Sequence, residues 1–318
     1  MFAIGLYDYG GPDVLQSVEQ PDPHPLSGQV RVKVRAAGIN PVDVMVRDGS
    51  LAEWFADAEP PFVPGMDISG IIDELGEGIS PASGIAIGQN VVGVVNNFGG
   101  YGGYSQYVCL PLESVTHLPD GVSLPDGAAF LMTALTARHA LDTLHLPQDS
   151  VVLVTGAAGA VGAYAVALGN VENLHIVAIA SPQDETFLRE LGASEFISRE
   201  DNLNTRIREK YPEGVCAVID AANIGEQIAH ALQDNGTIIN LRPKDPASLE
   251  RGIKQIFVNV RERIADQEAI TRLSLQVADG LLPVRVAKTF HASEAVSAHR
   301  LFEKGGLRGR IILDFDEK

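Results

Sequence analysis

The sequence predicts an α/β protein that combines a compact β-rich domain with a doubly wound domain built on a parallel sheet. The chain has 318 residues, which is long enough for two domains with separate cores. Up to about residue 120 it is rich in glycine and proline and carries short alternating apolar runs, as β-barrels do. Beyond about residue 122, apolar strand-like runs alternate with helical segments, and this alternation indicates right-handed βαβ units.

The strands of the first part are predicted from runs in which apolar and polar residues alternate. Prolines between these runs favour short strands joined by turns. The predicted strands cover residues 30–36, 68–74, 90–95 and 104–110. We therefore expect a β-barrel-like domain over residues 1–121.

The doubly wound domain is predicted over residues 122–280. A helix at 126–144 precedes a β-branched strand at 151–155 and a small-residue helix at 160–168. The further predicted strands cover residues 176–180, 217–220, 237–241 and 256–260. The last segment, 281–318, carries two strand-like runs around a helix at 292–303, and we expect it to return to the first domain.

The charge balance excludes two classes of partner. The chain has 24 basic and 41 acidic residues, a formal net charge of −17, and the acidic residues are spread along its length. A field of that sign repels phosphate backbones and anionic lipid, so we expect neither nucleic acid nor a membrane surface as a partner. Solubility alone is the other interpretation of this charge.

Cysteine usage and the lack of long apolar runs predict a cytoplasmic protein. Cys109 and Cys216 are too few for a four-thiolate zinc site or a disulfide framework. The opening MFAIGLYDYGG has no basic start, and no segment approaches the roughly 18 apolar residues of a membrane span.

A glycine-rich turn joins the strand at 151–155 to the helix that follows, in VVLVTGAAGAVGAYAVALG. Gly156, Gly159 and Gly162 recur at intervals of three, and Ala157, Gly159 and Gly162 match G-x-G-x-x-G with one substitution. Such a turn lets a pyrophosphate approach backbone amides at a helix N-terminus. The alternative is a tight turn that only packs a helix on a sheet; the βαβ context favours a nucleotide site.

With these segments in order, the chain resembles the zinc-independent, zeta-crystallin-like quinone oxidoreductase branch of the medium-chain dehydrogenase/reductase superfamily. The similarity spans nearly the whole chain. The segments that carry it are YGGPDVL at 9–15, AAGINPVDVMVRDG at 36–49, PFVPGMDISGII at 61–72, GGYSQYVCLP at 102–111, FLMTALTARHAL at 130–141, the glycine turn, LGAS at 191–194, VIDAAN at 218–223 and GLRGRIIL at 306–313. The resemblance implies a GroES-like β-barrel catalytic domain and a Rossmann nucleotide-binding domain.

The resemblance also implies an NADPH-dependent reductase that transfers hydride to a quinone or an α,β-unsaturated carbonyl. Its cleft lies between the two domains in the family, and the matching polar residues here are Asn40, Asp43 and Thr133, with the loop at 97–104. The structural alternatives are a turn residue for Asn40, a helix cap for Asp43 and a hydroxyl bonded to its own helix for Thr133.

For the cofactor, the resemblance favours NADP, with NAD as the alternative. Relatives that prefer NADP commonly have serine at the position of Ser181, but lysine where this chain has Asp184 and tyrosine where it has Arg199. Arg199 could replace the missing cation, or form only an exposed salt bridge, and Asp184 could serve only to cap a helix. The predicted cofactor-binding residues are Thr133, Gly156, Ala157, Gly159, Ala160, Val161, Gly162, Ser181, Arg199, Ala222 and Leu241.

No metal site is predicted. Zinc relatives carry cysteine at the position of Asn40 and a His-Glu pair where this chain has Met66 and Asp67, and an amide with a thioether cannot replace those ligands. We expect Asp67 to be a structural polar residue, and His139, His145 and His299 to be ordinary helix or surface residues. Trp54 is expected to pack in the core, with a substrate platform in the cleft as the alternative.

Two further possibilities stay open at this point. The first is a dinucleotide-binding protein without catalysis, serving a regulatory or structural role; the second is an NADH-preferring reductase of the same fold. The resemblance also suggests a homodimer formed by edge strands of the nucleotide domain, for which residues 237–241 are a candidate.

Overall fold

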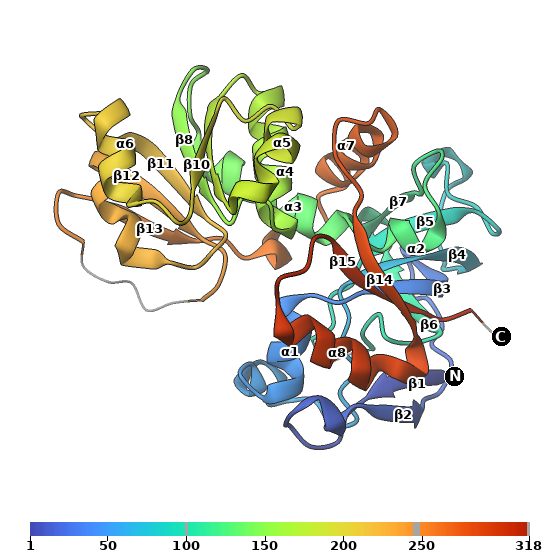
Figure 1. Cartoon of the computed structure of the whole chain (residues 1–318). Helices are drawn as coiled ribbons and strands as arrows, with labels where there is room; N and C mark the ends of the chain where they lie inside the picture. The colour runs from blue at the N-terminus through green and yellow to red at the C-terminus, as the bar shows by residue number, and fades with distance from the viewer. Residues whose placement is uncertain (99–100, 244–248, 317–318) are drawn as a thin grey trace. The chain divides into compact units, whose positions relative to one another are not determined.

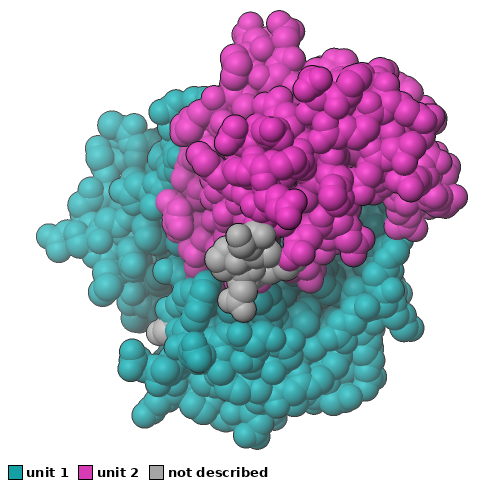
Figure 2. Space-filling model, turned by 90° about the vertical axis from the view of Figure 1, so that its left-hand side faces the viewer, with its two compact units in different colours: residues 1–132, 264–280, 284–318 teal, residues 133–263, 281–283 magenta. Residues whose placement is uncertain are grey.

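The computed structural model describes residues 1–98, 101–243 and 249–316, shown in Figure 1. Residue contacts divide the chain into two compact units, coloured separately in Figure 2. The first unit comprises Met1–Met132, Ile264–Gly280 and Val284–Lys318, and the second comprises Thr133–Arg263 and Leu281–Pro283. Among the described residues, none of the helices is both long and apolar enough to cross a bilayer.

The first unit is built on a mainly antiparallel sheet with a small additional sheet. The strand order along the larger sheet is β14-β15-β3-β4-β5-β7, and β6 pairs with β3 as well. A two-stranded sheet joins β1 to β2. The bounds are β1 Phe2–Gly5, β2 Gln16–Glu19, β3 Gln29–Gly38, β4 Asp67–Leu75, β5 Asn90–Val94, β6 Tyr107–Pro111, β7 Val115–His117, β14 Val286–His291 and β15 Arg310–Asp314.

Four helices belong to the first unit, and the C-terminal segment is part of its sheet. These helices are α1 Pro41–Asp48, α2 Leu124–Gly127, α7 Gln267–Ala278 and α8 Ala295–Lys304. The strand β15 pairs antiparallel with β3, with Leu313 opposite Ala37. Because Ile312 lies opposite Gly38, this pairing places the start of β15, at Arg310, beside the start of α1, where the catalytic candidates lie.

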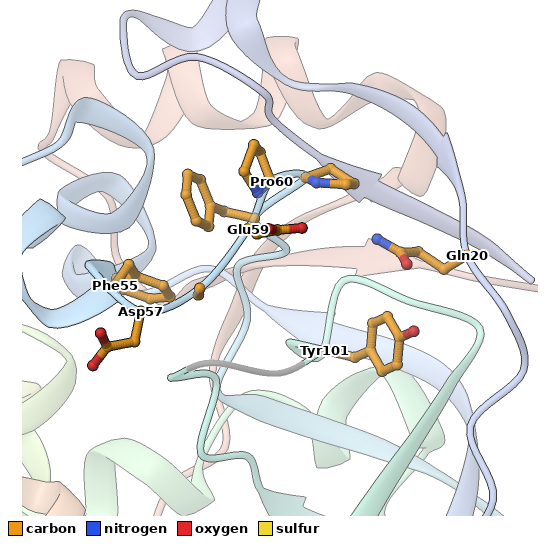
Figure 3. A pocket seen from close by; sticks show the side chains of 9 residues that line it. Gln20, Phe55, Asp57, Glu59, Pro60 and Tyr101 are labelled. Carbon is orange, nitrogen blue, oxygen red and sulfur yellow. The ribbon is translucent and has the colours of Figure 1, made fainter.

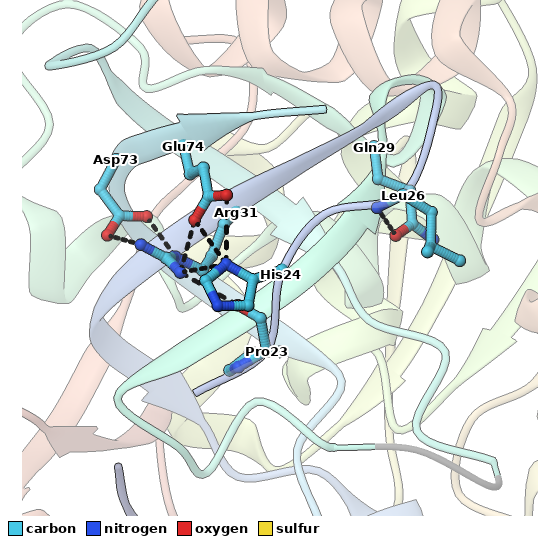
Figure 4. Close-up of polar contacts among 7 residues, drawn as sticks. All are labelled: Pro23, His24, Leu26, Gln29, Arg31, Asp73 and Glu74. Carbon is cyan, nitrogen blue, oxygen red and sulfur yellow. Dashed lines mark hydrogen bonds and ion pairs between the residues drawn. The ribbon is translucent and has the colours of Figure 1, made fainter. Parts of the chain in front are cut away.

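The sheet of the first unit is stabilised by a buried apolar core and by ion pairs at its surface. Alternate residues of β3, including Val30, Val32 and Val34, are buried in one cluster. On the opposite face, Arg31 forms a two-pronged ion pair with Asp73, with Nε to Oδ1 at 2.9 Å, and also pairs with Glu74 (Figure 4). Bidentate pairs of this kind join β3 to β4 with fixed geometry.

The second unit is a doubly wound parallel sheet. Its strand order is β10-β9-β8-β11-β12-β13, and every pairing is parallel. This is the order 3-2-1-4-5-6 in chain sequence, which is the order of dinucleotide-binding Rossmann domains. The bounds are β8 Val151–Thr155, β9 His175–Ala180, β10 Glu195–Ser198, β11 Val215–Asp220, β12 Leu232–Asn240 and β13 Lys254–Phe257, with helices α3 Leu131–Leu144, α4 Ala160–Val171, α5 Glu185–Glu190 and α6 Leu203–Lys210.

Three predicted elements differ from those observed. The helix expected at 126–144 is two helices, α2 and α3, separated at residues 128–130. The backbone here lies against β3, since a Cβ added to Gly38 would be 2.3 Å from the Ala128 oxygen, and the Asp67 carboxylate accepts from Met132 N at the start of α3 (3.4 Å). The strand predicted at 104–110 begins only at Tyr107, and the strand predicted at 256–260 is β13, which ends at Phe257.

The contact-based units also differ in extent from the predicted domains of 1–121, 122–280 and 281–318. Residues 122–132 and 264–280 belong to the first unit. The reason for the second of these is visible in α7, where Gln267 and Ser274 donate side-chain hydrogen bonds to the carbonyls of Val115 and His117 in β7. The assignment of a catalytic role to residues 1–121 and a nucleotide-binding role to residues 122–280 stays a prediction.

The homodimer also stays a prediction, but its candidate strand is misplaced. The strand β12 begins at Leu232, earlier than predicted, and ends at Asn240, so Leu241 follows it; β12 is paired on both sides, with β11 and β13. The outer strands of the described sheet are β10 and β13, and either has an edge that could pair with a second chain.

Candidate functional site

The carboxyl ends of the parallel strands in the second unit gather most of the predicted cofactor residues. The glycine turn follows β8, Ser181 follows β9 and Arg199 follows β10. Ala222 and Leu241 follow β11 and β12, whose last residues Asp220 and Asn240 are directly paired. Ligands of doubly wound folds bind at this edge of the sheet.

The glycine turn has the geometry that close approach of a phosphate requires. Gly156 has φ of +58°, the left-handed region that favours glycine. Gly159 is the N-cap of α4, so no side chain covers the first amides of that helix. A Cβ added to Gly162 would lie 2.3 Å from the Gly156 oxygen. The first glycine of the motif, absent at Ala157, is therefore supplied one residue earlier, at Gly156.

A buried hydrogen-bond brace holds the turns after β8 and β11 together. Thr155 Oγ1 donates to Asp220 Oδ1 (2.6 Å) and accepts from Ala222 N (3.0 Å). The same carboxylate accepts from Ile224 N and Gly225 N, at 3.1 and 2.7 Å. Because of this brace, Ala222 N lies 3.1 Å from the position of a Cβ on Gly156, so the two predicted cofactor residues are neighbours.

Ser181 and Arg199 are brought together beside the end of β9. Arg199 N donates to Ala180 O (2.8 Å), and the Arg199 side chain is exposed. Ser181 is the N-cap of the 3-10 turn Pro182–Asp184, yet its hydroxyl makes no capping hydrogen bond. Asp184 is 7% exposed at the end of this turn. The Ser181 hydroxyl thus does not cap the turn that follows it.

Asn40 and Asp43 lie together at the start of α1 in the first unit. Asp43 Oδ2 accepts from Asn40 N (2.7 Å) in a capping box, and Asp43 Oδ1 accepts from Gly65 N (2.9 Å). Both side chains are fully buried. The capping alternative for Asp43 is therefore realised, and the carboxylate also fixes the loop before β4, where Gly65 has φ of +104°.

Arg310 is the cation of this buried cluster. Arg310 Nη2 donates to Asn40 Oδ1 at 2.5 Å and lies 4.0 Å from Asp67 Oδ2. Among the residues that the structure describes, Asp67 Oδ2 and Arg310 Nε have no hydrogen-bond partner. Burial raises the pKa of Asp67 to about 7 and that of Asp43 to about 6, although Arg310 and backbone amides oppose both shifts.

A second set of buried polar side chains reaches Asp43 from α8 and from the segment before β6. Tyr104 Oη lies 3.3 Å from Asp43 Oδ2 and 3.2 Å from His299 Nε2, and His299 Nδ1 lies 3.2 Å from Arg47 Nη1. Arg47 also donates to Gly10 O and forms an ion pair with Glu303. His299 lies in the helix α8, as expected, but it is 0% exposed, so the surface alternative is wrong.

The remaining predicted residues lie elsewhere. Thr133 is buried in α3 and belongs to the second unit, as do the cofactor candidates, whereas Asn40 and Asp43 belong to the first. Trp54 is 43% exposed and meets Phe98 edge-on, so its expected core position is wrong. In the predicted loop at 97–104, residues 99 and 100 lie outside the described residues.

A separate pocket of about 400 Å³ in the first unit contains Tyr101 of the predicted loop at 97–104 but neither Asn40 nor Asp43 (Figure 3). Aromatic side chains of Phe55, Phe62 and Tyr101 line it together with the carboxylates of Asp57 and Glu59. Both carboxylates are exposed, so water already solvates them.

Metal ligands are lacking where zinc relatives hold the metal. Met66 is fully buried beside Asp67, and Asn40 offers an amide. In the described ranges, no group of three or more His, Cys, Asp or Glu side chains could hold a metal ion. The guanidinium of Arg310 already lies between Asn40 and Asp67, where it would repel a second cation.

Comparison with protein families matches two parts of the chain. Residues 26–120 match the alcohol dehydrogenase GroES-like domain, and residues 191–313 match the zinc-binding dehydrogenase family. The first match covers the sheet of the first unit from β3 to β7, and the second covers the strands from β10 to β15.

Individual relatives cover nearly the full length. A chloroplast envelope quinone oxidoreductase homolog of Arabidopsis thaliana is 27% identical over 99% of this chain and 98% of that protein. A quinone oxidoreductase of Sus scrofa is 28% identical over 98% of this chain and 97% of that protein. The solved structure of the quinone oxidoreductase from Coxiella burnetii superposes with a TM-score of 0.85 at 28% identity, covering 99% of both chains.

Proposed function

Because the chain belongs to the medium-chain dehydrogenase/reductase superfamily, we propose that it is a zinc-independent, NADPH-dependent reductase acting on a quinone or an α,β-unsaturated carbonyl. The relatives named quinone oxidoreductase identify it as an NAD(P)H-dependent oxidoreductase. Two features together carry the proposal. The glycine turn of the second unit has no side chain over the first amides of the helix that follows, and the buried polar cluster of the first unit does not suit a metal ion.

The residues of the second unit fit a dinucleotide. Gly156 and Gly159 leave the first amides of α4 open to a pyrophosphate, because neither residue carries a Cβ. Ala160, Val161 and Gly162 supply those amides, and Ala157, Ala222 and Leu241 line the edge of the sheet around them. When bound, the nicotinamide supplies the hydride, and the protein supplies binding, orientation and electrostatics.

Ser181 and Arg199 are proposed to select NADPH. A 2′-phosphate needs local donors in a protein of net charge −17, and the Ser181 hydroxyl and the Arg199 guanidinium are suited to it. Arg199 is exposed, and its backbone is bonded to Ala180, the last residue of β9 before Ser181, so its side chain can fold over this edge. Asp184 is buried and is given no role in this selection.

The polar cluster of the first unit and Thr133 are proposed to hold and orient the acceptor and nicotinamide. The oxygen of a quinone or enone gains negative charge as it is reduced, and Arg310 and the Asn40 amide provide positive potential without a metal. Zinc does not fit here, because Asn40 and Met66 replace its ligands and Arg310 occupies the neighbouring space.

Steady-state turnover with NADPH and NADH side by side tests this function. The acceptors are an ortho-quinone and a short 2-enone, and the readout is the loss of reduced-nicotinamide absorbance. We expect higher kcat/KM with NADPH, and Arg199→Ala should lower kcat/KM for NADPH at least about tenfold while leaving NADH unchanged.

The same assay distinguishes the alternatives. A preference for NADH that Arg199→Ala does not alter would contradict the role of Arg199 and favour the NADH-dependent reductase. Tight NADPH binding without turnover of any acceptor would favour the non-catalytic dinucleotide-binding protein.

A further inference from the structure

The side chains between Glu303 and Asp43 form one hydrogen-bond chain through buried protein. Arg47, His299, Tyr104 and Asp43 are each at most 2% exposed, and the three contacts between them are 3.2, 3.2 and 3.3 Å. At its Arg47 end the chain reaches Glu303, whose side chain is 37% exposed to solvent. The members come from α1, α8 and the segment before β6, which all belong to the first unit.

The direction of the chain follows from the chemistry of its first member. A guanidinium can only donate, so His299 Nδ1 must accept from Arg47 and carries no proton. Arg47 cannot turn away, because its Nε donates to Gly10 O and its other terminal nitrogen pairs with Glu303. His299 is therefore neutral, with its proton on Nε2. Burial and the charge of Arg47 agree, since they lower the pKa of His299 to about 3.

The direction continues to Asp43. His299 Nε2–H donates to Tyr104 Oη, and the Tyr104 hydroxyl must then place its own hydrogen on Asp43 Oδ2. Asp43 already accepts from Asn40 N on that oxygen and from Gly65 N on the other. With three donors, both oxygens act as acceptors, and this arrangement favours the ionised carboxylate.

We propose that Arg47, His299 and Tyr104 are positioning residues, which form a one-way hydrogen-bond chain that holds Asp43 as a fixed carboxylate beside Asn40. The proposal rests on the proposed function in one respect, namely that Asn40 and Asp43 serve the reduction. It assigns Asp43 the role of an acceptor that orients Asn40 and the loop at Gly65. Arg47 cannot release its proton, so the chain does not carry protons between solvent and the site.

Few charged or titratable side chains face Asp43 and His299. Asp43 meets Arg310 from β15, Tyr104 from the segment before β6 and the carboxyl of Asp67 from β4, while His299 meets Arg47 from α1 and the Tyr104 hydroxyl. Arg310 and Tyr104 both favour the ionised form of Asp43, whereas burial disfavours it. Removal of the Tyr104 hydroxyl should therefore raise the pKa of Asp43.

The first test is a nitrogen NMR spectrum of the intact protein, with the His299 signal identified by its loss in His299→Gln. We expect the neutral Nε2–H tautomer, unchanged across the neutral pH range. A cationic ring or a proton on Nδ1 would overturn the proposal, whether or not the protein reduces any acceptor. This measurement does not depend on activity, so it separates failure of the chain from failure of the proposed function.

The second test compares variants in the pH dependence of kcat/KM. Tyr104→Phe should move the acidic limb upward by about one pH unit, because a hydrogen bond to a charged group is lost. His299→Leu should act in the same way, whereas His299→Gln should retain most of the native profile, since its amide can accept from Arg47 and donate to Tyr104.

Tyr107→Phe is the matched control. Tyr107 is on β6, three residues from Tyr104, and its ring packs against Arg31 on the other side of the sheet. It should leave the pH profile unchanged. An acidic limb of the pH profile that stays in place in both Tyr104→Phe and His299→Leu would overturn the positioning role. If either variant fails to fold, the His299 tautomer measurement still tests the hydrogen-bond chain.

Discussion

At the scale of single residues, Asp67 links burial to the pH dependence of stability. Its folded pKa of about 7 lies above the ordinary value of 3.8, so the folded protein keeps a proton that the unfolded chain loses. The free energy of unfolding therefore decreases as pH rises from about 4 to about 7. Asp67→Asn has no titrating group at this position. The free energy of unfolding of this variant, relative to that of the native protein, should therefore rise by about 2–4 kcal/mol over that pH window.

Denaturant unfolding at several pH values measures this difference. Asp120→Asn, at an exposed position, is the control and should show a small difference at every pH. A difference for Asp67→Asn that does not change with pH would mean that Asp67 is ionised and paired with Arg310 in the folded protein throughout.

The glycine turn gives a second prediction at this scale. Gly159 has ordinary extended backbone, with φ of −74° and ψ of 179°, and a Cβ there would meet only the Gly156 oxygen at 3.0 Å. Gly159→Val should therefore fold but cover the first amides of α4, so its affinity for NADPH should fall at least about tenfold. Calorimetric titration measures the affinity, and near-native circular dichroism shows that the fold is retained.

Gly162→Val is the contrasting variant, because its Cβ would lie 2.3 Å from the Gly156 oxygen. We expect it to lose stability as well as binding. Native NADPH affinity in Gly159→Val would remove the glycine turn from the cofactor site.

The sequence could predict those candidate residues that lie in a local motif. Asn40 and Asp43 are three residues apart, and the turn glycines follow a recognisable strand. Tyr104 was included only as the end of the predicted loop at 97–104, His299 was given no site role and Arg47 was not named, because the hydrogen bond from Arg47 to His299 joins residues 252 positions apart. Neither the spacing of the histidines nor the pattern of α8 indicates that one imidazole is buried against a guanidinium.

At the scale of elements, the strand β8 was predicted with its observed bounds, because a β-branched run before a glycine turn favours a buried strand over other secondary structures. The break between α2 and α3 was not predicted, because its cause is tertiary. The backbone of β3 approaches Ala128, and the carboxylate of Asp67 bonds the first turn of α3. Helix propensity alone would continue through residues 128–130.

Gly38→Ala tests the close approach of β3 to Ala128. The added methyl would lie 2.3 Å from the Ala128 oxygen, which is backbone and cannot rotate away. We expect a loss of about 1–3 kcal/mol in the free energy of unfolding, measured with denaturant. Gly11→Ala, where nothing lies within 4 Å of the new Cβ, should be close to neutral, and equal stability of both variants would contradict this packing.

At the scale of the whole molecule, the net charge of −17 should oppose the approach of an anionic cofactor. Long-range repulsion is screened by salt, whereas short contacts such as that proposed for Arg199 are screened less. The association rate of NADPH should therefore increase about two- to tenfold between roughly 0.01 and 0.15 M salt, as measured by stopped-flow fluorescence. A rate that decreases with salt would mean that a local positive field at the glycine turn dominates the encounter.

The two-part organisation was readable from the change of pattern near residue 122, but the extent of each unit was not. The segment 264–280 returns to the first unit through side-chain hydrogen bonds of α7 to β7, and such contacts leave no periodic signal in the sequence. The return of the C-terminal strand to β3 could be predicted, since its alternation matches the first part of the chain.

The measurement that tests the central claim most directly is turnover of an ortho-quinone with NADPH before and after exhaustive removal of metal by a chelator. We expect the same rate in both preparations and no gain on adding zinc, because Asn40, Met66 and Arg310 leave no place for the ion. Loss of activity on chelation, restored by one equivalent of zinc, would contradict the account.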